Sequence, residues 1–271
     1  MEAKSVNFKQ AKGIKSAFLV IVCCFIIALC LFIFVFGDPA NFMNNDPNNH
    51  PLPGNFKGTI YKGGVIVPIL QTLFLTVIVL SIERAFALIQ AKGKGNVVKF
   101  VRNVKAALDA NDTQKARELC IKQKGCVASV IYSTLTKYEE MEKDTTLAKD
   151  QKLMNIQKEL DEATALEMPS LQQNLVVIAT MTTLGTLVGL LGTVIGMIRA
   201  FAALSNAGAP DSVALSAGIS EALINTAFGI ATGALAVISY NFFSSKIDKL
   251  TYSIDEVGFT IVQTYAATHK A

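Results

Sequence analysis

The sequence predicts an all-α integral membrane protein with four transmembrane helices, whose long helices extend into a cytoplasmic helical domain. Composition is the first observation behind this prediction: of the 271 residues, 51% are hydrophobic and only 17% are charged, whereas soluble domains contain about 25% charged residues. The second is that the apolar residues gather in four long runs. Each run reaches the roughly 20 residues that a helix needs to cross a bilayer.

The four runs and the segments between them divide the chain into nine parts. The predicted membrane helices are residues 17–36, 64–90, 171–204 and 213–245. The predicted polar parts are an N-terminal cytoplasmic segment 1–16, a periplasmic loop 37–63, a cytoplasmic helical domain 91–170, a short periplasmic turn 205–212 and a cytoplasmic tail 246–271.

Each element has a local reason. The first run is longer than the roughly 7–15 apolar residues of a cleaved signal peptide, which favours a retained anchor over that alternative. Residues 37–63 are rich in Pro, Asn, Gly and Asp, which is typical of a loop. Pro169 interrupts the charged helix before the third run and predicts a kink there. The third run is about 45 Å long as a helix and must tilt or project from a core of about 30 Å. Asp211 or Ser212 can cap the fourth helix.

Lysine and arginine set the predicted orientation. The N-terminal segment has four of them, the 37–63 loop two, the 91–170 domain fourteen, the 205–212 turn none and the tail three. Because basic residues favour the cytoplasmic side, both termini and the helical domain are predicted to lie in the cytoplasm, with the two short loops outside.

The residue inventory argues against several classes of function. Cys120 and Cys126 have no second pair and no neighbouring histidine, so a zinc site is not predicted. The chain has only two histidines, His50 and His269, and no catalytic constellation can be built from them. The basic residues are not clustered with aromatic residues, so nucleic-acid binding is unsupported. We predict no enzyme activity, no metal and no cofactor.

Small residues recur at helical spacing in the third and fourth runs. Glycines on one face of a membrane helix let a second helix backbone approach closely, because packing drives association there. We therefore predict helix packing through Gly185, Gly189, Gly192, Gly196, Gly229 and Gly233.

Polar residues stand beside these glycines. Glu221 lies well inside its helix, where a carboxylate costs about 2.5 kcal/mol or more and normally faces a partner or a water-filled path. Thr193 and Thr226 stand at comparable depth on either side of the turn. We predict that these three residues line a narrow polar path. Further candidates for the pore or as charge partners are Asn225, Arg199 and Thr186. The alternative is that the glycines and threonines only pack helices, with each hydroxyl bonded to its own helix.

At these residues the sequence resembles the MotA/TolQ/ExbB proton-channel family, and within it ExbB and TolQ. The resemblance rests on "GLLGTVIGMIRAF", on "GISEALINTAFGIATGALAVISYNFF", on "ELDEATALEMPSLQQNLVVIAT" and on "SIERAFALIQA", and it covers roughly residues 65–245. Position by position, Thr193 and Thr226 match the pore-lining threonines of the family, and Glu221 matches its intramembrane glutamate. Thr186 stands where many members have proline or another residue, and the first helix is an addition to the three-helix pattern.

The resemblance implies a homopentamer in the bacterial inner membrane around an ExbD- or TolR-like single-span partner that carries a transmembrane aspartate. Proton motive force would then drive work through a TonB-like protein for outer-membrane transport. A TolQ-like role in envelope maintenance, or a motility motor, is implied equally by the chain itself. Two other classes stay open: a passive membrane scaffold, and a self-sufficient secondary transporter, although no internal repeat is visible.

Overall fold

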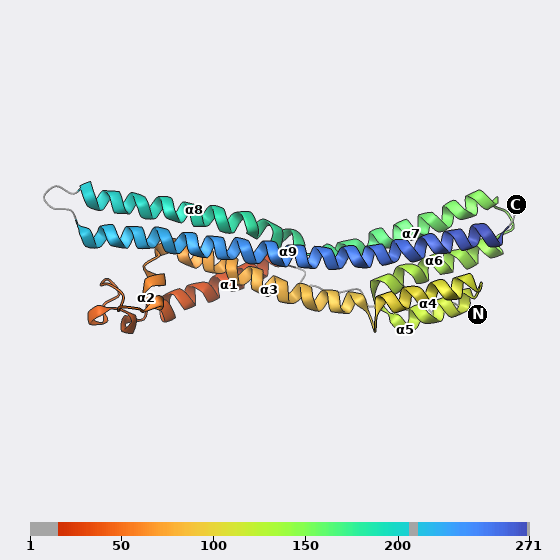
Figure 1. The fold of residues 1–271 in the computed structure, drawn as a ribbon, viewed down its shortest axis with the longest axis horizontal. Helices are drawn as coiled ribbons and strands as arrows, with labels where there is room; N and C mark the ends of the chain where they lie inside the picture. Colours follow the sequence, from red (N-terminus) through yellow and green to blue (C-terminus); the bar gives the residue numbers. More distant parts are fainter. Residues whose placement is uncertain (1–15, 206–210, 270–271) are drawn as a thin grey trace. The chain divides into compact units, whose positions relative to one another are not determined.

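The computed structural model describes residues 16–205 and 211–269, so nearly all of the predicted N-terminal segment and much of the 205–212 turn lie outside the described residues. In the described part the chain is helical, and the nearest approach to a strand is one isolated bridge between Phe42 and Pro51. The chain divides into two compact units (Figure 1). Residues 16–82 and 174–241 form the membrane unit, and residues 83–173 with the end of the chain from 242 form the helical unit.

Among the described residues, four stretches are long and apolar enough to cross a membrane. They contain α1 (Ala17–Cys30) with the π-helical turn η1 (Leu31–Phe36), α3 (Val67–Lys92), α8 (Leu175–Ser205) and α9 (Ser212–Thr268). α3 and α9 contribute residues to both units. The predicted fourth helix and tail are therefore one continuous helix of 57 residues.

The four long helices of the membrane unit share one apolar core. Side chains from all four helices meet there: Val20 and Cys24 on α1, Val77 and Leu80 on α3, Ile178 and Met181 on α8, and Ala236 on α9. Large apolar side chains on the outer faces remain exposed, among them Phe18 and Ile26 on α1, Leu187 and Ile198 on α8, and Ile230 and Ile238 on α9. An apolar surface of this kind is expected where helices face lipid.

The 37–63 loop is an ordered structure, although its sequence shows no periodicity. It contains the short 3-10 turns η2 (Pro39–Asn41) and η3 (Met43–Asn45) and the helix α2 (Phe56–Tyr61). Asn41 Nδ2 donates to the carbonyl of Val35, 2.9 Å away, at the end of η1. Tyr61 stacks on Phe32, with ring centroids 4.8 Å apart. Turn residues and aromatic contacts thus hold the loop against the end of the first helix.

α8 and α9 form an antiparallel hairpin whose contact face is made of small residues. A Cβ placed on Gly196 would lie 2.7 Å from the backbone N of Ala222, and one placed on Gly189 would lie 2.9 Å from the Cα of Gly229. Asp211 caps α9, because its Oδ1 accepts the N–H groups of Val213 and Ala214, each at 3.0 Å. The glycines that the sequence singled out thus lie between two helices of the same chain, where backbones can approach this closely only without side chains.

The helical unit packs four shorter helices with parts of α3 and α9. These are α4 (Val97–Asp109), α5 (Thr113–Gln123), α6 (Gly125–Lys143) and α7 (Lys149–Gln172). Side-chain caps set two of the starts: Asn96 Oδ1 accepts from Val98 N, and Asp112 Oδ1 accepts from Lys115 N, both at 2.9 Å. The buried core includes Val104 and Leu108 on α4, Cys120 on α5, Ile131 and Leu135 on α6, Ile156 on α7, and Ile254 and Ile261 on α9.

The interruption before the third membrane helix lies beyond Pro169. α7 continues through the proline to Gln172, and α8 begins at Leu175. Asn174 has a positive φ of 61°, a conformation that ends a helix. The buried Arg84 donates from Nη1 to the carbonyls of Ser170 and Leu171, both at 3.3 Å. The last turn of α7 therefore has a partner for carbonyls that the helix leaves unpaired.

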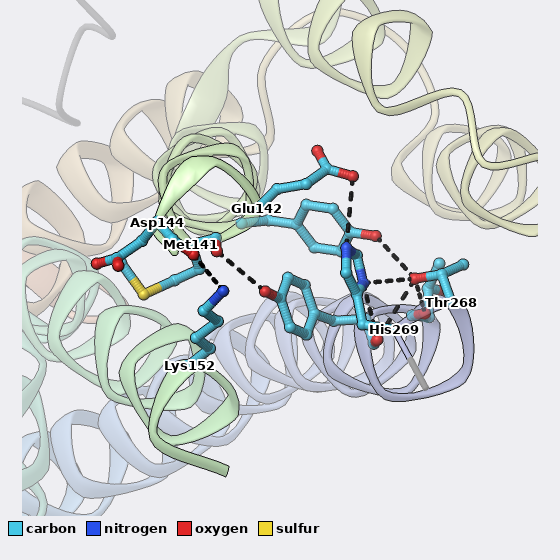
Figure 2. A network of polar contacts seen from close by, with 9 residues as sticks. Met141, Glu142, Asp144, Lys152, Thr268 and His269 are labelled. Atoms are coloured by element: carbon cyan, nitrogen blue, oxygen red, sulfur yellow. Dashed lines mark hydrogen bonds and ion pairs between the residues drawn. The ribbon is translucent and has the colours of Figure 1, made fainter. Parts of the chain in front are cut away.

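The far end of α9 is attached to the end of α6 by a network of ring and polar contacts (Figure 2). Tyr265 donates its hydroxyl to the Met141 carbonyl at 3.1 Å, and burial raises the pKa of Tyr265, so the donor proton is retained. His269 stacks on Tyr265 with centroids 4.2 Å apart, and its Nε2 lies 3.7 Å from Glu142 Oε1. The tail of the chain is thus part of the folded helical unit.

Candidate functional site

Arg199 and Glu221 form an ion pair between α8 and α9. Nη1 of Arg199 lies 2.7 Å from Oε1 and 2.8 Å from Oε2 of Glu221. The Glu221 side chain is 5% exposed, whereas that of Arg199 is 53% exposed. A carboxylate removed from water needs such a partner, because an unpaired charge in an apolar environment costs several kcal/mol (roughly 3–5 when one partner is removed).

The turn that leads into α3 covers the Glu221 carboxylate of this pair. A Cβ on Gly64 would overlap Oε1 of Glu221 and would lie 3.4 Å from Nη1 of Arg199. Gly64 has a φ of +75°, so both its conformation and the close approach favour glycine. We call Gly63 and Gly64 the elbow. Its second residue, Gly64, begins the 3-10 turn η4 (Gly64–Ile66), and α3 follows directly at Val67.

Asn225 attaches the elbow one helical turn further along α9. Its Nδ2 donates to the Gly63 carbonyl at 3.0 Å, and the residue is fully buried. Gly192 on α8 provides the space, because a Cβ there would overlap the Asn225 side chain. Glu221 and Asn225 are four residues apart and so lie on adjoining turns of one helix. Asn225 thus bonds the elbow to the hairpin, and Glu221 packs against it.

The threonines occupy the other edge of the hairpin. Thr193 and Thr226 each follow directly after a residue of the α8–α9 contact, namely Gly192 and Asn225. Since the helices are antiparallel, one step forward on both turns the side chains by about 100° toward the same edge of the pair. Thr186 also lies at this edge, where its Cγ2 faces Gly233.

Arg199 and Glu221 come one residue before the contact residues Ala200 and Ala222. Their side chains therefore point to the edge of the hairpin opposite the threonines. Their ion pair agrees with this placement. The hairpin therefore has two edges. Thr186, Thr193 and Thr226 define the threonine edge, and the Arg199–Glu221 ion pair lies on the opposite edge, where the elbow covers Glu221. The structure brings Thr193 and Thr226 together at one depth, within about 3 Å along the helix axes. It places Glu221 on the opposite edge.

The threonine hydroxyls are not free in the isolated chain. Thr193 Oγ1 donates to the Leu190 carbonyl at 2.6 Å, and Thr226 Oγ1 donates to the Ala222 carbonyl at 3.2 Å. Both side chains are half-buried. A hydroxyl that donates to its own helix still has lone pairs that accept from water. The threonine edge can thus hold water but cannot carry a charge.

Sequence reasoning did not identify the elbow. It also missed the role of Glu221, whose carboxylate lies closest to Gly64. The signal was present in "YKGGVIVP", because paired glycines before an apolar run mark a point of close backbone approach. Gln71 on α3 was missed as well. It is 6% exposed, and neither its amide oxygen nor its amide nitrogen has a partner among the described residues.

No cluster of three or more metal-binding side chains occurs among the residues that the structure describes. Burial raises the pKa values of Cys120 and Cys126 to about 12 each. Both thiols therefore stay protonated at neutral pH, which disfavours reactivity and metal binding.

Comparison with known proteins identifies the region that contains this hairpin. Residues 124–256 match the model of the MotA/TolQ/ExbB proton channel family. The match begins at the start of α6 and runs through α7, α8 and most of α9. The segment 81–91, which also resembles the family, lies outside the matched range.

Curated relatives agree with the family model. A putative biopolymer transport protein ExbB-like 3 of Synechocystis is 34% identical over 88 residues, which are 32% of this chain and 42% of the relative. The Tol-Pal system protein TolQ of Haemophilus influenzae is 36% identical over 109 residues, 39% of this chain and 47% of the relative. The biopolymer transport protein ExbB of Xanthomonas campestris is 35% identical over 89 residues, 33% of this chain and 35% of the relative.

The chain thus spans less than half the length of the curated relatives it matches. Four apolar stretches and these similarities make it a multi-pass membrane protein of the ExbB/TolQ type. Residues 124–256, which hold the ion pair, the threonine edge and the glycine contact between α8 and α9, match the MotA/TolQ/ExbB proton channel family.

Proposed function

We propose that this protein is a proton-channel subunit of the bacterial inner membrane that converts proton motive force into mechanical work for TonB-dependent transport across the outer membrane. It acts with an ExbD- or TolR-like single-span partner that carries a transmembrane aspartate, and a TonB-like protein receives the work. The observation that carries the proposal is the threonine edge: Thr193 and Thr226 lie at one depth on an edge of the hairpin that the chain leaves uncovered.

The threonine edge is suited to face the centre of a ring. Its neighbours on the hairpin are exposed apolar side chains, including Leu190 (61% exposed), Leu223 (66%) and Ile230 (59%). The elbow covers the opposite edge. Five copies whose threonine edges face the centre of the ring surround a channel. Its lining has threonine hydroxyls at one level and apolar side chains around them. Closed rings of identical subunits are a common way to build such a channel.

The hydroxyls have a supporting role in this channel. A threonine does not ionise at physiological pH, so the proton is carried by the aspartate of the partner helix. Thr193 and Thr226 hydrogen-bond the water that delivers and removes the proton. The membrane potential contributes about 2.3 kcal/mol per charge per 100 mV. Glu221, on the covered edge, holds the hairpin to the elbow and does not line the channel.

Valine substitution tests the threonine edge. Thr193→Val and Thr226→Val keep the shape of the side chain and remove only the hydroxyl. Each is expected to lower proton-driven activity roughly tenfold, because one lost hydrogen bond costs on the order of 1 kcal/mol. The measurement is energy-dependent outer-membrane uptake in a deletion strain, with co-purification of the single-span partner to verify assembly.

Thr180→Val is the matched control. Thr180 also lies on α8, and its Oγ1 donates to its own helix, to the Val176 carbonyl at 2.8 Å. Its side chain is exposed on a different face. Full activity is expected in this variant. If both threonine-edge variants keep full uptake while assembling normally, the polar residues are structural and the passive scaffold becomes the better description.

A Tol-type role is a second candidate, favoured by the TolQ-named relatives, which are as similar in sequence as the ExbB-named ones. The same threonine edge serves both. Complementation separates them: the gene is expressed in strains that lack either system, and TonB-dependent uptake is measured beside detergent resistance of the envelope. Restoration of envelope integrity alone assigns the chain to the Tol-type role.

A further inference from the structure

The helical unit contains a basic pocket that the channel function does not use. It measures about 220 Å³ and lies between the α3–α4 turn, the first turns of α4 and the last turn of α5. Three exposed lysines line it, one from each segment: Lys94, Lys99 and Lys122. Amide side chains complete the polar lining: Asn96, Asn103 and Gln123.

Among the described residues, no carboxylate lines this pocket. None of the three lysines has an ion pair in the part of the chain that the structure describes. Elsewhere in the helical unit lysines do find acidic partners, as Lys105 does with Glu256 at 2.9 Å. Three like charges around one pocket repel each other, and an anion between them removes that repulsion.

The lysines are brought together by a tight crossing of two turns. Gln123 Nε2 donates to the Lys92 carbonyl at 3.1 Å, and the backbone N–H of Lys94 donates to the Gln123 carbonyl at 2.6 Å. Gly93 (φ +74°) and Gly125 (φ +83°) are so close that a Cβ on either would overlap backbone atoms of the other turn. Two glycines in left-handed conformations thus allow these turns to contact each other.

The place of the pocket in the fold suggests the kind of anion. The exposed apolar side chains of α3 in this unit end with Phe86 (63% exposed) and Ile89 (66%), and the basic turn follows directly. In the predicted topology this is the level of the inner-leaflet headgroups. Basic side chains at this level attract anionic lipids, and flexible lysine ammonium groups bind phosphate as point charges.

We propose that Lys94, Lys99 and Lys122 form a binding site for a phosphate-bearing anion, supplied either by the headgroup of an anionic phospholipid or by a soluble phosphate compound. The site lies in the helical unit and goes beyond the proposed channel function. An anion bound to the folded protein stabilises it against unfolding, and binding weakens at high salt because the contacts are ionic.

The test uses the full-length protein with two probes. The thermal unfolding midpoint is measured in phosphatidylcholine nanodiscs while pyrophosphate is titrated, and separately in nanodiscs that contain both phosphatidylcholine and phosphatidylglycerol. The variant Lys94→Gln with Lys122→Gln is expected to bind the effective probe at least roughly tenfold more weakly, because charge-assisted contacts are lost. Lys94→Arg with Lys122→Arg keeps both charges and is expected to retain binding, which shows that the variants fold.

Lys115→Gln with Lys143→Gln is the matched control, since both lysines are exposed, lie in the same unit and are outside the pocket. A pyrophosphate response that only the pocket variant loses assigns the site to a soluble phosphate compound. A phosphatidylglycerol response with the same dependence assigns it to the lipid headgroup. If neither probe stabilises the unaltered protein, or if pocket and control variants respond equally, the proposal is wrong.

Discussion

At the scale of single residues, Glu221 shows how a membrane carboxylate can be structural. It is almost completely buried, and its charge is met by Arg199 from the neighbouring helix, whose guanidinium is half exposed. Arg199 thus supplies the positive charge that compensates the carboxylate, while the exposed side of its guanidinium stays in contact with water. The pair fixes the rotation of α9 against α8 at the point where the elbow arrives.

Glu221→Gln tests this structural role. The amide removes the charge and leaves Arg199 unpaired, so the free energy of unfolding is expected to fall by about 1–3 kcal/mol, less than for a fully buried pair because Arg199 reaches water. The measurement is thermal or denaturant unfolding of the purified protein. In Arg199→Met with Glu221→Gln, no unpaired charge remains, and part of the loss is expected to return.

The opposite pattern would give Glu221 a direct role with the proton. In that case Glu221→Gln would unfold like the unaltered protein and yet abolish uptake, and the double variant would recover nothing. The two roles are distinguishable because one changes stability first and the other changes only transport.

At the scale of elements, the elbow is where α3 joins the hairpin. Two side chains of α9 lie against it. The Glu221 carboxylate is so close to position 64 that only glycine fits there, and Asn225 donates a hydrogen bond to the Gly63 carbonyl. The start of α3 is thus defined by contacts from a helix more than 150 residues away in the sequence.

Gly64→Ala is expected to loosen this junction, and the chain contains a matched control. Gly54 has a nearly identical φ of +78°, but nothing lies within 4 Å of a Cβ placed there. Both substitutions carry the backbone cost of a left-handed alanine, about 1–2 kcal/mol. Only Gly64→Ala also displaces the Glu221 carboxylate. We expect Gly64→Ala to lower the unfolding midpoint clearly more than Gly54→Ala does, and equal midpoints would show that the elbow contact is unimportant.

Packing against other helices also determines the length of α9. The sequence predicts a membrane helix to residue 245 and a separate tail, because charged residues follow the apolar run. The helix continues to Thr268 because the tail keeps an apolar stripe, with Ile254, Val257 and Ile261 each fully buried in the helical unit. Charge marks where a membrane helix meets water and says little about where the helix ends.

At the scale of the whole molecule, topology is the property that the remaining claims depend on. We expect a cysteine at Asn48 to react with a membrane-impermeant thiol reagent added outside intact cells and one at Asp150, beside Lys149, to be protected, because basic residues are concentrated in the 91–170 segment. The exposed Cys23 and Cys30 are first replaced by alanine. Labelling at position 150 alone would overturn the predicted orientation and with it the proposed function.

The sequence by itself determined the class of the protein and the chemistry available to it. Hydrophobic run length predicts four membrane helices, and the part of the chain that the structure describes contains four helical stretches of that kind. Glycine spacing predicts a close helix contact, because only glycine lets backbones touch. The motifs around Thr193 and Thr226 indicated the proton-channel family, which the family model confirms for residues 124–256. All of these signals are local along the chain.

Only the tertiary structure decided which polar residues share an edge. Glu221 and Thr226 are five residues apart, and depth alone suggested that they line one path. The antiparallel pairing of α8 and α9 turns the threonines to one edge and the Arg199–Glu221 pair to the other, where the elbow covers it. The physical reason is that rotation about a helix axis becomes meaningful only when a second helix fixes which face is inside. That partner lies outside the local pattern from which a sequence is interpreted.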